Sequence, residues 1–445
     1  RRRPQPSAHF RRTPMDPSAT PSEPQCQVQF VTKLEDRWRV TEAPIQLPTR
    51  LTRFGLSEVV NTLLNASPPR PFDFLVQGEL LRGPLSKAFA RLGLSGEAAI
   101  TLEYIELVPP PQPEHTCAHP DWITSVVPHA DAGHLLTGCY DNAAYVWDAA
   151  GKQLAELRAH AGPVKGVDWL GAAASGALRA VSASKDHTVR TWQIESGAVR
   201  CEAVGASHMG SVECVSANPA GSLFCSGSWD GTLQIWSAAE KALSAAAPSA
   251  ARPAKRTKGS KGAPDGDGGE TAAAAELQPE AALDGHHDCV SAVCWPTANL
   301  IYSASLDGTI REWNAEASSC SATLGGQKAA LAVSVSLANA TIATAHTDHA
   351  IRLWDTRLQG ASLKLTLPHK AWASAVAWSP SNDHLLLSAC HDGGVRLWDT
   401  RSTLPLQEAP PHTDKALCAA WASAERVVSG GADAQLRIAQ IRAAS

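Results

Sequence analysis

The residues with the most obvious chemical potential are histidines, serines or threonines, and aspartates that recur together along the chain. A histidine, a hydroxyl and a carboxylate are also the parts of a catalytic triad, in which the histidine takes a proton from the hydroxyl. Here the hydroxyl lies four residues before the aspartate, and in six of seven copies a histidine lies 21 to 26 residues before it. Because one chain does not need seven copies of an active site, the repetition favours a structural role.

Most copies also have a tryptophan six residues after the aspartate. The histidines are His119, His160, His208, His286, His369 and His412, with Gly326 in this place in the fifth copy. The hydroxyls belong to Thr137, Ser182, Ser226, Ser303, Thr344, Ser388 and Ser429. Each aspartate and the residue six positions after it form the pairs Asp141–Trp147, Asp186–Trp192, Asp230–Trp236, Asp307–Trp313, Asp348–Trp354, Asp392–Trp398 and Asp433–Ala439. Copies five and seven each lack one member, so we expect their networks to be incomplete.

The spacing of the copies indicates a repeat architecture. A period of about 40–45 residues is typical of the four-stranded blade of a β-propeller. The pattern resembles the WD-repeat family, whose blades use a His–Ser/Thr–Asp–Trp chain to satisfy buried polar groups. We therefore predict a mainly β protein with a seven-bladed propeller over residues 119–441. Residues 109–118 should form a linker and pair with blade seven, because the last repeat ends without an outer strand.

Blade three is interrupted by an insertion between its third and outer strands. Residues 238–281 are rich in Ala, Gly and Pro and nearly free of large apolar side chains, which predicts a disordered loop. Lys255, Arg256 and Lys258 form a basic cluster within it, typical of nuclear-import signals and of RNA-contacting tails. A merely solvated loop is the alternative interpretation.

Residues 25–108 have a different character, with one tryptophan and no blade pattern. Apolar alternation predicts strands near 26–32, 39–45, 72–76, 78–81 and 98–107, and helical segments that begin near Ser57 and span 85–92. This order is typical of a small α+β ubiquitin-like (β-grasp) domain. Residues 1–24 are expected to be a disordered tail. We interpret Met15 as the natural start, with a genuine basic tail as the alternative.

Four segments make a more specific resemblance. They are RFGLSEVVN (53–61), PFDFL (71–75), GELLR (78–82) and GLSGE (93–97). They resemble the Notchless-like N-terminal domain, and with seven blades they make the chain similar to the WD-repeat ribosome-biogenesis factors of the PeBoW complex. The resemblance implies a non-enzymatic assembly factor for the large (60S) ribosomal subunit, needed for maturation of large-subunit and 5.8S rRNA. It implies a location in the nucleus, nucleolus and nucleoplasm.

The resemblance also implies partners and one site residue. The partners are pescadillo, a propeller protein of the block-of-proliferation type, pre-60S particles, and the AAA ATPase midasin, which releases the factor through the ubiquitin-like domain. In this family an acidic residue at the GLSGE motif, here Glu97, completes the coordination of a divalent ion held by midasin. A carboxylate suits a hard cation such as Mg²⁺. The chain itself needs no cofactor, and without the resemblance Glu97 would be an ordinary exposed acid.

The sequence lacks the motifs that would indicate other classes of function. The sequence contains no P-loop, HExxH or GxSxG, which argues against an enzyme. A net charge of −4 gives no global basic field for nucleic acid, and no apolar run reaches the roughly 18 residues of a membrane span. The eleven cysteines form no C-x-x-C pair, which suits a reducing compartment. The one metal-like group is His286, His287, Cys289 and Cys294, which we expect to belong to blade four instead.

Two alternative functions stay open. A Notchless-type pre-60S factor would share the ubiquitin-like domain, but that family has eight blades and seven aspartate turns predict seven. A generic WD-repeat scaffold or ubiquitin-ligase substrate receptor would not need the Notchless-like segments. No membrane contact is expected, and direct contact with RNA is left open.

Overall fold

The structure is a computed structural model that describes residues 24–34, 36–41, 43–66, 69–93, 99–106, 111–131, 133–172, 176–195, 198–238, 274–325, 328–357, 362–401 and 405–441. Contacts divide the chain into an N-terminal unit that ends at Leu107 and a larger unit that spans Val108–Ala443. In the described part of the chain, no helix has the length and apolar character that crossing a membrane requires.

The N-terminal unit is a five-stranded mixed sheet with two α-helices. Its elements are β1 (Gln25–Val31), a 3-10 helix (Asp36–Trp38), β2 (Ile45–Pro48), α1 (Arg53–Leu64), β3 (Phe72–Val76), β4 (Glu79–Leu80), α2 (Leu85–Leu92) and β5 (Ile100–Glu106). The strand order is β2-β1-β5-β3-β4, with β1 and β5 parallel and the other neighbours antiparallel. This is the order of a β-grasp fold, as predicted.

The core of this unit is aromatic. Phe30, Phe74 and Tyr104 are fully buried, and the ring of Phe30 lies 6.0 Å from that of Phe74 and 6.2 Å from that of Tyr104. The predicted strand at 39–45 was wrong, and β2 lies further on. Tyr104 explains the difference, because its hydroxyl donates to the Trp38 carbonyl at 2.6 Å and accepts from the Val40 amide at 2.9 Å. These bonds hold residues 38–40 in an irregular connection.

Helix α1 also differs from the prediction, since it begins at Arg53 rather than near Ser57. The Leu56 amide bonds to the Thr52 carbonyl, and Leu56 is fully buried. Arg53 pairs with Asp73 of β3 at 3.0 Å, which ties the first turn of the helix to the sheet. A contact between residues this far apart has no local sequence signal.

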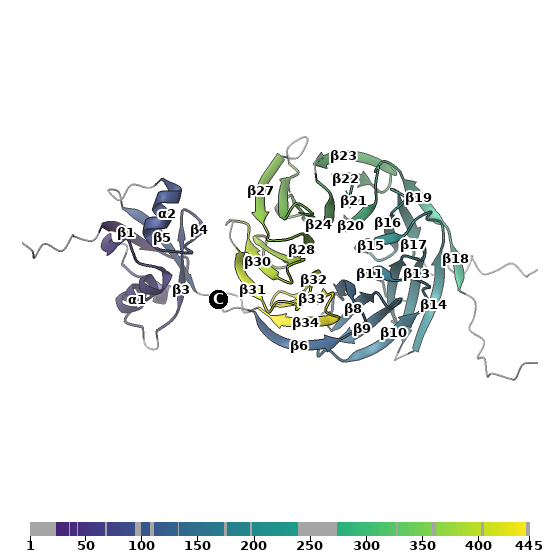
Figure 1. Cartoon of the computed structure of the whole chain (residues 1–445), viewed down its shortest axis with the longest axis horizontal. Coiled ribbons are helices and arrows are strands. Elements are labelled where there is room, and N and C mark those ends of the chain that lie inside the picture. The colour runs from purple at the N-terminus through teal and green to yellow at the C-terminus, as the bar shows by residue number, and fades with distance from the viewer. Residues whose placement is uncertain are drawn as a thin grey trace, which may run out of the picture. The chain divides into compact units, whose positions relative to one another are not determined.

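The larger unit consists of seven sheets around a central axis (Figure 1), which we number as blades one to seven. Blade one contains β7 (Ile123–Pro128), β8 (His134–Cys139), β9 (Ala143–Asp148) and β10 (Gln153–Arg158). Blade two contains β11 (Val164–Leu170), β12 (Leu178–Ser184), β13 (Val189–Glu195) and β14 (Ala198–Gly205). Blade three contains β15 (Val212–Ala217), β16 (Leu223–Ser228), β17 (Leu233–Ser237) and β19 (Pro279–Leu283). Blade four contains β20 (Val290–Thr297), β21 (Leu300–Ser305), β22 (Thr309–Asn314) and β23 (Ser319–Gly325).

The remaining blades repeat this antiparallel order. Blade five contains β24 (Ala330–Ser336), β25 (Thr341–His346), β26 (Ala350–Asp355) and β27 (Ser362–Pro368). Blade six contains β28 (Ala373–Trp378), β29 (Leu385–Cys390), β30 (Val395–Asp399) and β31 (Pro405–Ala409). Blade seven contains β32 (Ala416–Ser423), β33 (Arg426–Gly431), β34 (Gln435–Gln440) and β6 (Gln112–Ala118).

The first strand of this unit completes the last blade. β6 pairs antiparallel with β34, and Arg426 pairs with Glu114 at 2.6 Å. The innermost strand of blade seven, β32, also lies against β7 of blade one. The predicted seven blades, with residues 113–118 closing the last one, are therefore present.

The insertion in blade three follows β17, as predicted, but its expected extent was wrong at the C-terminal end. β18 (Ala275–Leu277) pairs in parallel with β14 of blade two, and β19 begins at Pro279. Leu277 is buried in the cluster that contains Phe224 and Trp236, and Ala275 packs against the same cluster, so these two side chains anchor β18. Regular structure, which was predicted to resume after residue 281, is already present at β18.

Candidate protein-interaction surfaces

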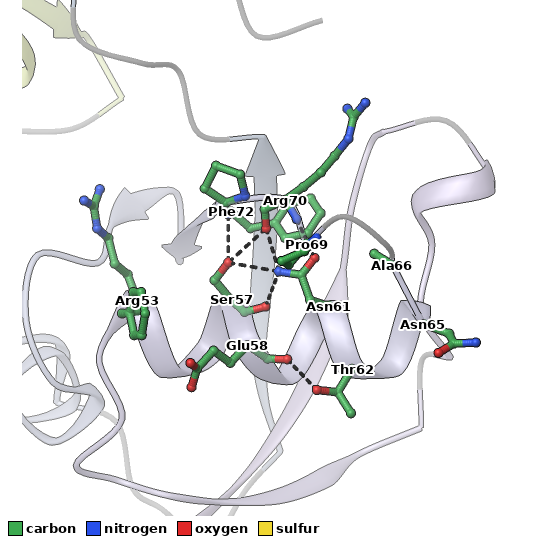
Figure 2. A pocket seen from close by; sticks show the side chains of 12 residues that line it. Arg53, Ser57, Glu58, Asn61, Thr62, Asn65, Ala66, Pro69, Arg70 and Phe72 are labelled. Atoms are coloured by element: carbon green, nitrogen blue, oxygen red, sulfur yellow. Dashed lines mark hydrogen bonds between the residues drawn. The ribbon is translucent and has the colours of Figure 1, made fainter.

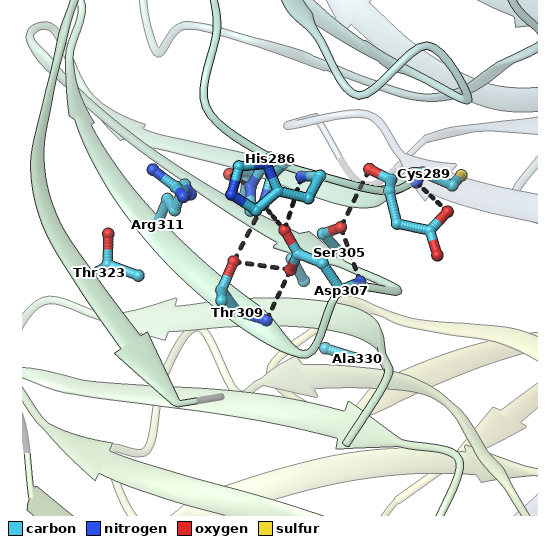
Figure 3. A network of polar contacts seen from close by, with 12 residues as sticks. His286, Cys289, Ser305, Asp307, Thr309, Arg311, Thr323 and Ala330 are labelled. Carbon is cyan, nitrogen blue, oxygen red and sulfur yellow. Dashed lines mark hydrogen bonds and ion pairs between the residues drawn. The ribbon is translucent and has the colours of Figure 1, made fainter. Parts of the chain in front are cut away.

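Blade four contains a buried chain of hydrogen bonds from tryptophan to aspartate. Trp313 Nε1 donates to Ser303 Oγ at 2.8 Å, and His286 Nε2 lies 2.7 Å from the same oxygen. His286 Nδ1 lies 3.1 Å from Asp307 Oδ2, while Thr309 Oγ1 donates to Asp307 Oδ1 at 2.7 Å. Figure 3 shows Asp307 held between His286 and Thr309. The chain links β21, β22 and the connection before β20 to the turn that holds the aspartate.

Blades two and three contain the same chain. The residues are His160, Ser182, Asp186 and Trp192 in blade two, and His208, Ser226, Asp230 and Trp236 in blade three. In these three blades the structure brings together all four members that the sequence indicated.

The geometry of these sets favours stability over catalysis. The side chain of His286 and the residue Ser303 are both fully buried, and the serine hydroxyl accepts the indole N–H. Burial lowers the pKa of His286, so the imidazole is neutral at pH 7. Burial alone would raise the pKa of Asp230, but hydrogen bonds from Thr232 and other groups lower it to about 2. A serine shielded from solvent cannot act as a nucleophile on a dissolved substrate.

Blades one, five and six pair their aspartate with arginine or tyrosine. His119 and His369 reach the hydroxyl of their blade at 2.9 and 3.0 Å, and His369 Nδ1 also lies 3.2 Å from the Leu367 carbonyl. Burial lowers the pKa of each imidazole to about 4. The aspartate contacts are Asp141 with Tyr145 and Arg158, Asp348 with Arg352, and Asp392 with Arg396. The histidine–aspartate bond expected in blades one and six is therefore replaced, because a stronger donor reaches the carboxylate.

Blade five was predicted to have an incomplete chain, and its described contacts do not join a histidine to Asp348, which faces Arg352, while His346 Nδ1 lies 3.2 Å from the Lys328 carbonyl. A histidine outside the repeat position nevertheless supplies part of the chain. His346, two residues after Thr344 on β25, places Nε2 2.8 Å from Thr344 Oγ1, and Trp354 Nε1 donates to the same oxygen at 2.8 Å. The imidazole thus reaches the hydroxyl along the same strand, β25. In blade seven, His412 contacts Ser429 and Asp433, and Ala439 leaves the tryptophan place empty, as the sequence indicated.

One face of the propeller is marked by a backbone hydrogen bond that recurs in every blade. In blade one the Tyr140 amide, directly after β8, donates to the carbonyl of Trp122, directly before β7. The other pairs, donor first, are Lys185–Pro163, Trp229–Ser211, Leu306–Cys289, Thr347–Ala329, His391–Trp372 and Ala432–Lys415. Because these residues occupy equivalent places, their side chains form one ring on a single face.

Large aromatic side chains gather on this ring in blades six, one and three. Trp122, Trp229 and Trp372 are 43%, 54% and 47% exposed. Trp122 lies 5.5 Å from the Tyr140 ring, and Trp372 lies 5.5 Å from the His391 ring. We call these five residues the aromatic face. Exposed tryptophans in contact with other rings are typical of protein-binding surfaces.

Polar contacts hold part of the aromatic face in place. Lys185 Nζ donates to the Tyr140 hydroxyl at 2.6 Å, and Trp229 Nε1 donates to Glu213 Oε1 at 2.9 Å. Lys165 lies 3.3 Å from the other oxygen of Glu213, so charge and rings form one connected strip across blades one to three. A surface ordered in advance loses less entropy when a partner binds.

The sequence reasoning missed the aromatic face, although a signal was present. Trp122 and Trp372 each lie three residues after a blade histidine, and Trp229 directly precedes a blade aspartate. The innermost strands β7 and β28 begin directly after Trp122 and Trp372, which places both tryptophans on this face of the propeller. Reading the positions beside the repeated residues would have identified them.

The N-terminal domain has a pocket of about 780 Å³ beside α1 (Figure 2). Asn61 fixes one wall, because its Nδ2 donates to the Arg70 carbonyl at 2.6 Å and its Oδ1 accepts from the Arg70 amide at 2.8 Å. Ser57 Oγ accepts from the Phe72 amide, so it too is used to hold the entry to β3. Phe54 belongs to the lining and is 72% exposed. Hydrogen bonds to the backbone therefore hold the Asn61 and Ser57 side chains of the pocket lining.

Several predicted residues lie outside the described residues or serve the blades. Glu97, in the segment between α2 and β5, lies outside the described residues, and so do Lys255, Arg256 and Lys258. In the metal-like group, His286 belongs to the blade chain, and burial raises the pKa of the Cys289 and Cys294 thiols to about 12. Protonated thiols are poor metal ligands.

Comparison with protein families matches both units. Residues 26–89 match the NLE (NUC135) domain, and residues 111–148, 151–193, 200–237, 277–314 and 361–399 match the WD domain, G-beta repeat. The matched repeats cover the tryptophan-containing strands of blades one, two, three, four and six.

Relatives match over nearly the whole chain. A ribosome biogenesis protein WDR12 homolog of Chlamydomonas reinhardtii is 36% identical over 444 residues, covering 94% of this chain and 98% of that protein. The Arabidopsis thaliana homolog is 36% identical over 92% of this chain and 95% of its own length. The Nematostella vectensis homolog is 34% identical, and the match covers 93% of this chain and 98% of that protein. With an NLE domain followed by WD repeats, the chain belongs to the WDR12 family of ribosome biogenesis proteins.

Proposed function

We propose that this protein is a non-enzymatic assembly factor of the large ribosomal subunit, acting in the nucleolus and nucleoplasm during maturation of large-subunit and 5.8S rRNA. Relatives that match along almost their full length are named ribosome biogenesis proteins. The observation that carries the proposal is the union of an NLE-type β-grasp domain with a seven-bladed propeller whose His–Ser–Asp sets are buried structural groups. Two separate units suit a factor that docks through one and is removed through the other.

The aromatic face is the docking surface that we assign to the propeller. Tryptophan and tyrosine dominate the energetic centres of protein interfaces, because each buries a large area with few rotatable bonds. The partners implied by the family resemblance are a propeller protein of the block-of-proliferation type and, through it, pescadillo and the pre-60S particle. Exposed aromatic side chains that are held by neighbouring rings and polar contacts are well suited to bind another folded protein.

The N-terminal domain supplies the means of release. We assign Glu97 as the ligand that completes the coordination of a Mg²⁺ ion held by midasin. An adhesion-type metal site leaves one position on a hard cation open, and a carboxylate oxygen fills it well. The basic residues Lys255, Arg256 and Lys258 are assigned to nuclear import.

The alternatives fit less well. A Notchless-type factor is expected to have eight blades, whereas this propeller has seven sheets. A general scaffold or ubiquitin-ligase receptor would not account for the match to the NLE domain. Neither alternative gains support from a specific feature of the described residues.

The release step is tested with Glu97→Ala in cells that carry a tagged copy. We expect the variant to stay on pre-60S particles, with at least tenfold loss of binding to the metal-site domain of midasin and unchanged recovery of the propeller partner. Glu79→Ala and Glu103→Ala are matched controls, because Glu79 pairs with Arg91 and Glu103 pairs with Lys33. If Glu97→Ala binds like the parent while a control variant does not, the assignment is wrong.

The docking step is tested with the double variant Trp122→Ala/Trp372→Ala. Both residues are exposed, so the fold should persist while recovery of the propeller partner falls at least tenfold. Leu363→Ala is the control, since Leu363 is 50% exposed but lies on the outer strand β27. Equal recovery from the double variant and the control would remove the aromatic face as the docking surface.

A further inference from the structure

A separate group of convergent side chains lies on the β7–β8 hairpin of blade one. His129 directly follows β7, His134 is the first residue of β8, and Asp131 lies in the turn between them. His129 Nδ1 is 3.0 Å from Asp131 Oδ1, and His134 Nδ1 is 3.0 Å from Asp131 Oδ2. The ligand atoms of the three residues lie within 4.8 Å of one another. None of these residues takes part in the hydrogen-bond chain of the blade.

The surroundings hold this group in position. The His129 amide donates to the His134 carbonyl at 2.8 Å, which closes the hairpin and sets the two histidines side by side. The Gly133 amide donates to Asp131 Oδ1 at 2.7 Å and orients the carboxylate. The ring of Trp169, from blade two, contacts the His129 ring edge-on at 5.0 Å. Trp169 is itself fixed, since its indole N–H donates to a backbone carbonyl of β7 at 3.0 Å.

We propose that His129, Asp131 and His134 form a binding site for a divalent first-row transition metal such as Zn²⁺ or Co²⁺. Two imidazole nitrogens and one carboxylate oxygen are a donor set that these metals accept, whereas Mg²⁺ and Ca²⁺ prefer oxygen ligands throughout. With metal–ligand bonds of about 2.0–2.2 Å, the donors of a tetrahedral site lie roughly 3.3 Å apart. The carboxylate already lies 3.0 Å from each imidazole and all the ligand atoms lie within 4.8 Å of one another, so side-chain rotations would bring the donors to this separation.

Metal binding exchanges one set of contacts for another. Each Nδ1 that faces the carboxylate turns its lone pair to the metal, and each neutral imidazole then carries its proton on Nε2. Three protein ligands leave one coordination position for water. The bound ion would link the end of β7 to the start of β8 and stiffen the hairpin against Trp169. This site is independent of the proposed docking and release functions.

The test uses the full chain with Cys320→Ser, because Cys320 is an exposed thiol that could bind metal on its own. Titration with Co²⁺, followed by visible absorption and by calorimetry, should show one ion bound per chain. His129→Ala, His134→Ala and Asp131→Asn should each weaken binding at least tenfold. Zn²⁺ should raise the Tm of the parent and leave the Tm of the His129→Ala/His134→Ala variant unchanged.

His384→Ala is the matched control. His384 is exposed beside Asp383 on the equivalent hairpin of blade six, where Ser379 stands in the place of His129. This variant should bind Co²⁺ like the parent. Absence of Co²⁺ binding by the parent, or equal binding by the parent and the His129→Ala/His134→Ala variant, would overturn the proposal.

Discussion

Blades two to four and blades one, five and six build the same sheet with different partners for one buried aspartate. In the first group the carboxylate faces the blade histidine, and in the second it faces arginine, with tyrosine added in blade one. The repeat therefore does not require one particular bond. What the two groups share is that the carboxylate of the aspartate has a donor, whether that donor is histidine, arginine or tyrosine.

The residue two positions after the aspartate differs between these two groups of blades. In the first group it is threonine, whose hydroxyl donates to one carboxylate oxygen at 2.6–2.7 Å and leaves the other oxygen towards the histidine. In the second group it is alanine or glycine, and the carboxylate turns to the cation. The threonines are Thr188, Thr232 and Thr309, and the replacements are Ala143, Ala350 and Gly394.

The largest expected effect comes from removing the aspartate in each group. Asp307→Ala should lower the free energy of unfolding by about 4 kcal/mol, because it leaves His286, Thr309 and backbone amides without a buried acceptor. Asp348→Ala should cost only about 1 kcal/mol, since the Asp348 and Arg352 side chains are 25% and 19% exposed. Urea unfolding measures both, and equal losses would break the comparison.

Low pH should destabilise the fold most clearly in blades one and six, where the blade histidine does not contact the blade aspartate. The folded pKa of His119 and of His369 is about 4, below the ordinary 6.5, so the unfolded chain takes up the protons first. The stabilisation is full above about pH 6.5 and is lost as pH falls towards 4, by on the order of 3 kcal/mol for each residue.

Urea midpoints between pH 7 and pH 4.5 measure this loss. His369→Gln, which cannot titrate, should flatten the curve. Hydrogen exchange at pH 5 should show blades one and six opening before blades two to four. Uniform opening of all the blades would contradict the prediction.

A smaller effect is expected from the threonine that distinguishes the groups. Thr309→Ala should cost about 1 kcal/mol by removing one hydrogen bond to Asp307. Thr309→Ser, which keeps the hydroxyl, should recover most of that loss in the same unfolding measurement. A Ser variant as unstable as the Ala variant would assign the effect to the lost methyl group instead.

The smallest effect is expected in the blade-three insertion. Replacing residues 239–273 by a short Gly/Ser linker should change the unfolding free energy by less than about 1 kcal/mol, because loop length has a weak entropic cost. Extending the replacement to residue 281 should be clearly destabilising, since it removes β18 and part of β19. Equal Tm values for the two replacements would show that β18 adds nothing.

Features that repeat or alternate could be predicted from the sequence. Seven aspartate turns predicted seven blades, and the missing outer strand of the last repeat predicted its pairing with β6. His346 could not be found this way, because it reaches Thr344 along the same strand rather than from the repeat position. The start of α1 depends on Arg53 meeting Asp73, a contact made only after folding. Contacts that depend on tertiary packing have no periodic signal.

Because β6 belongs to the last blade, its synthesis and its pairing are far apart in time. Glu114 and Arg426, which form an ion pair across this blade, are separated by 312 residues. At about 5–20 residues per second, on the order of 15–60 s pass between the synthesis of the two. During that interval β6 has no partner strand and can pair with another chain. A premature stop that removes only β34 would prolong the same exposure indefinitely, leaving both β33 and β6 with an open edge.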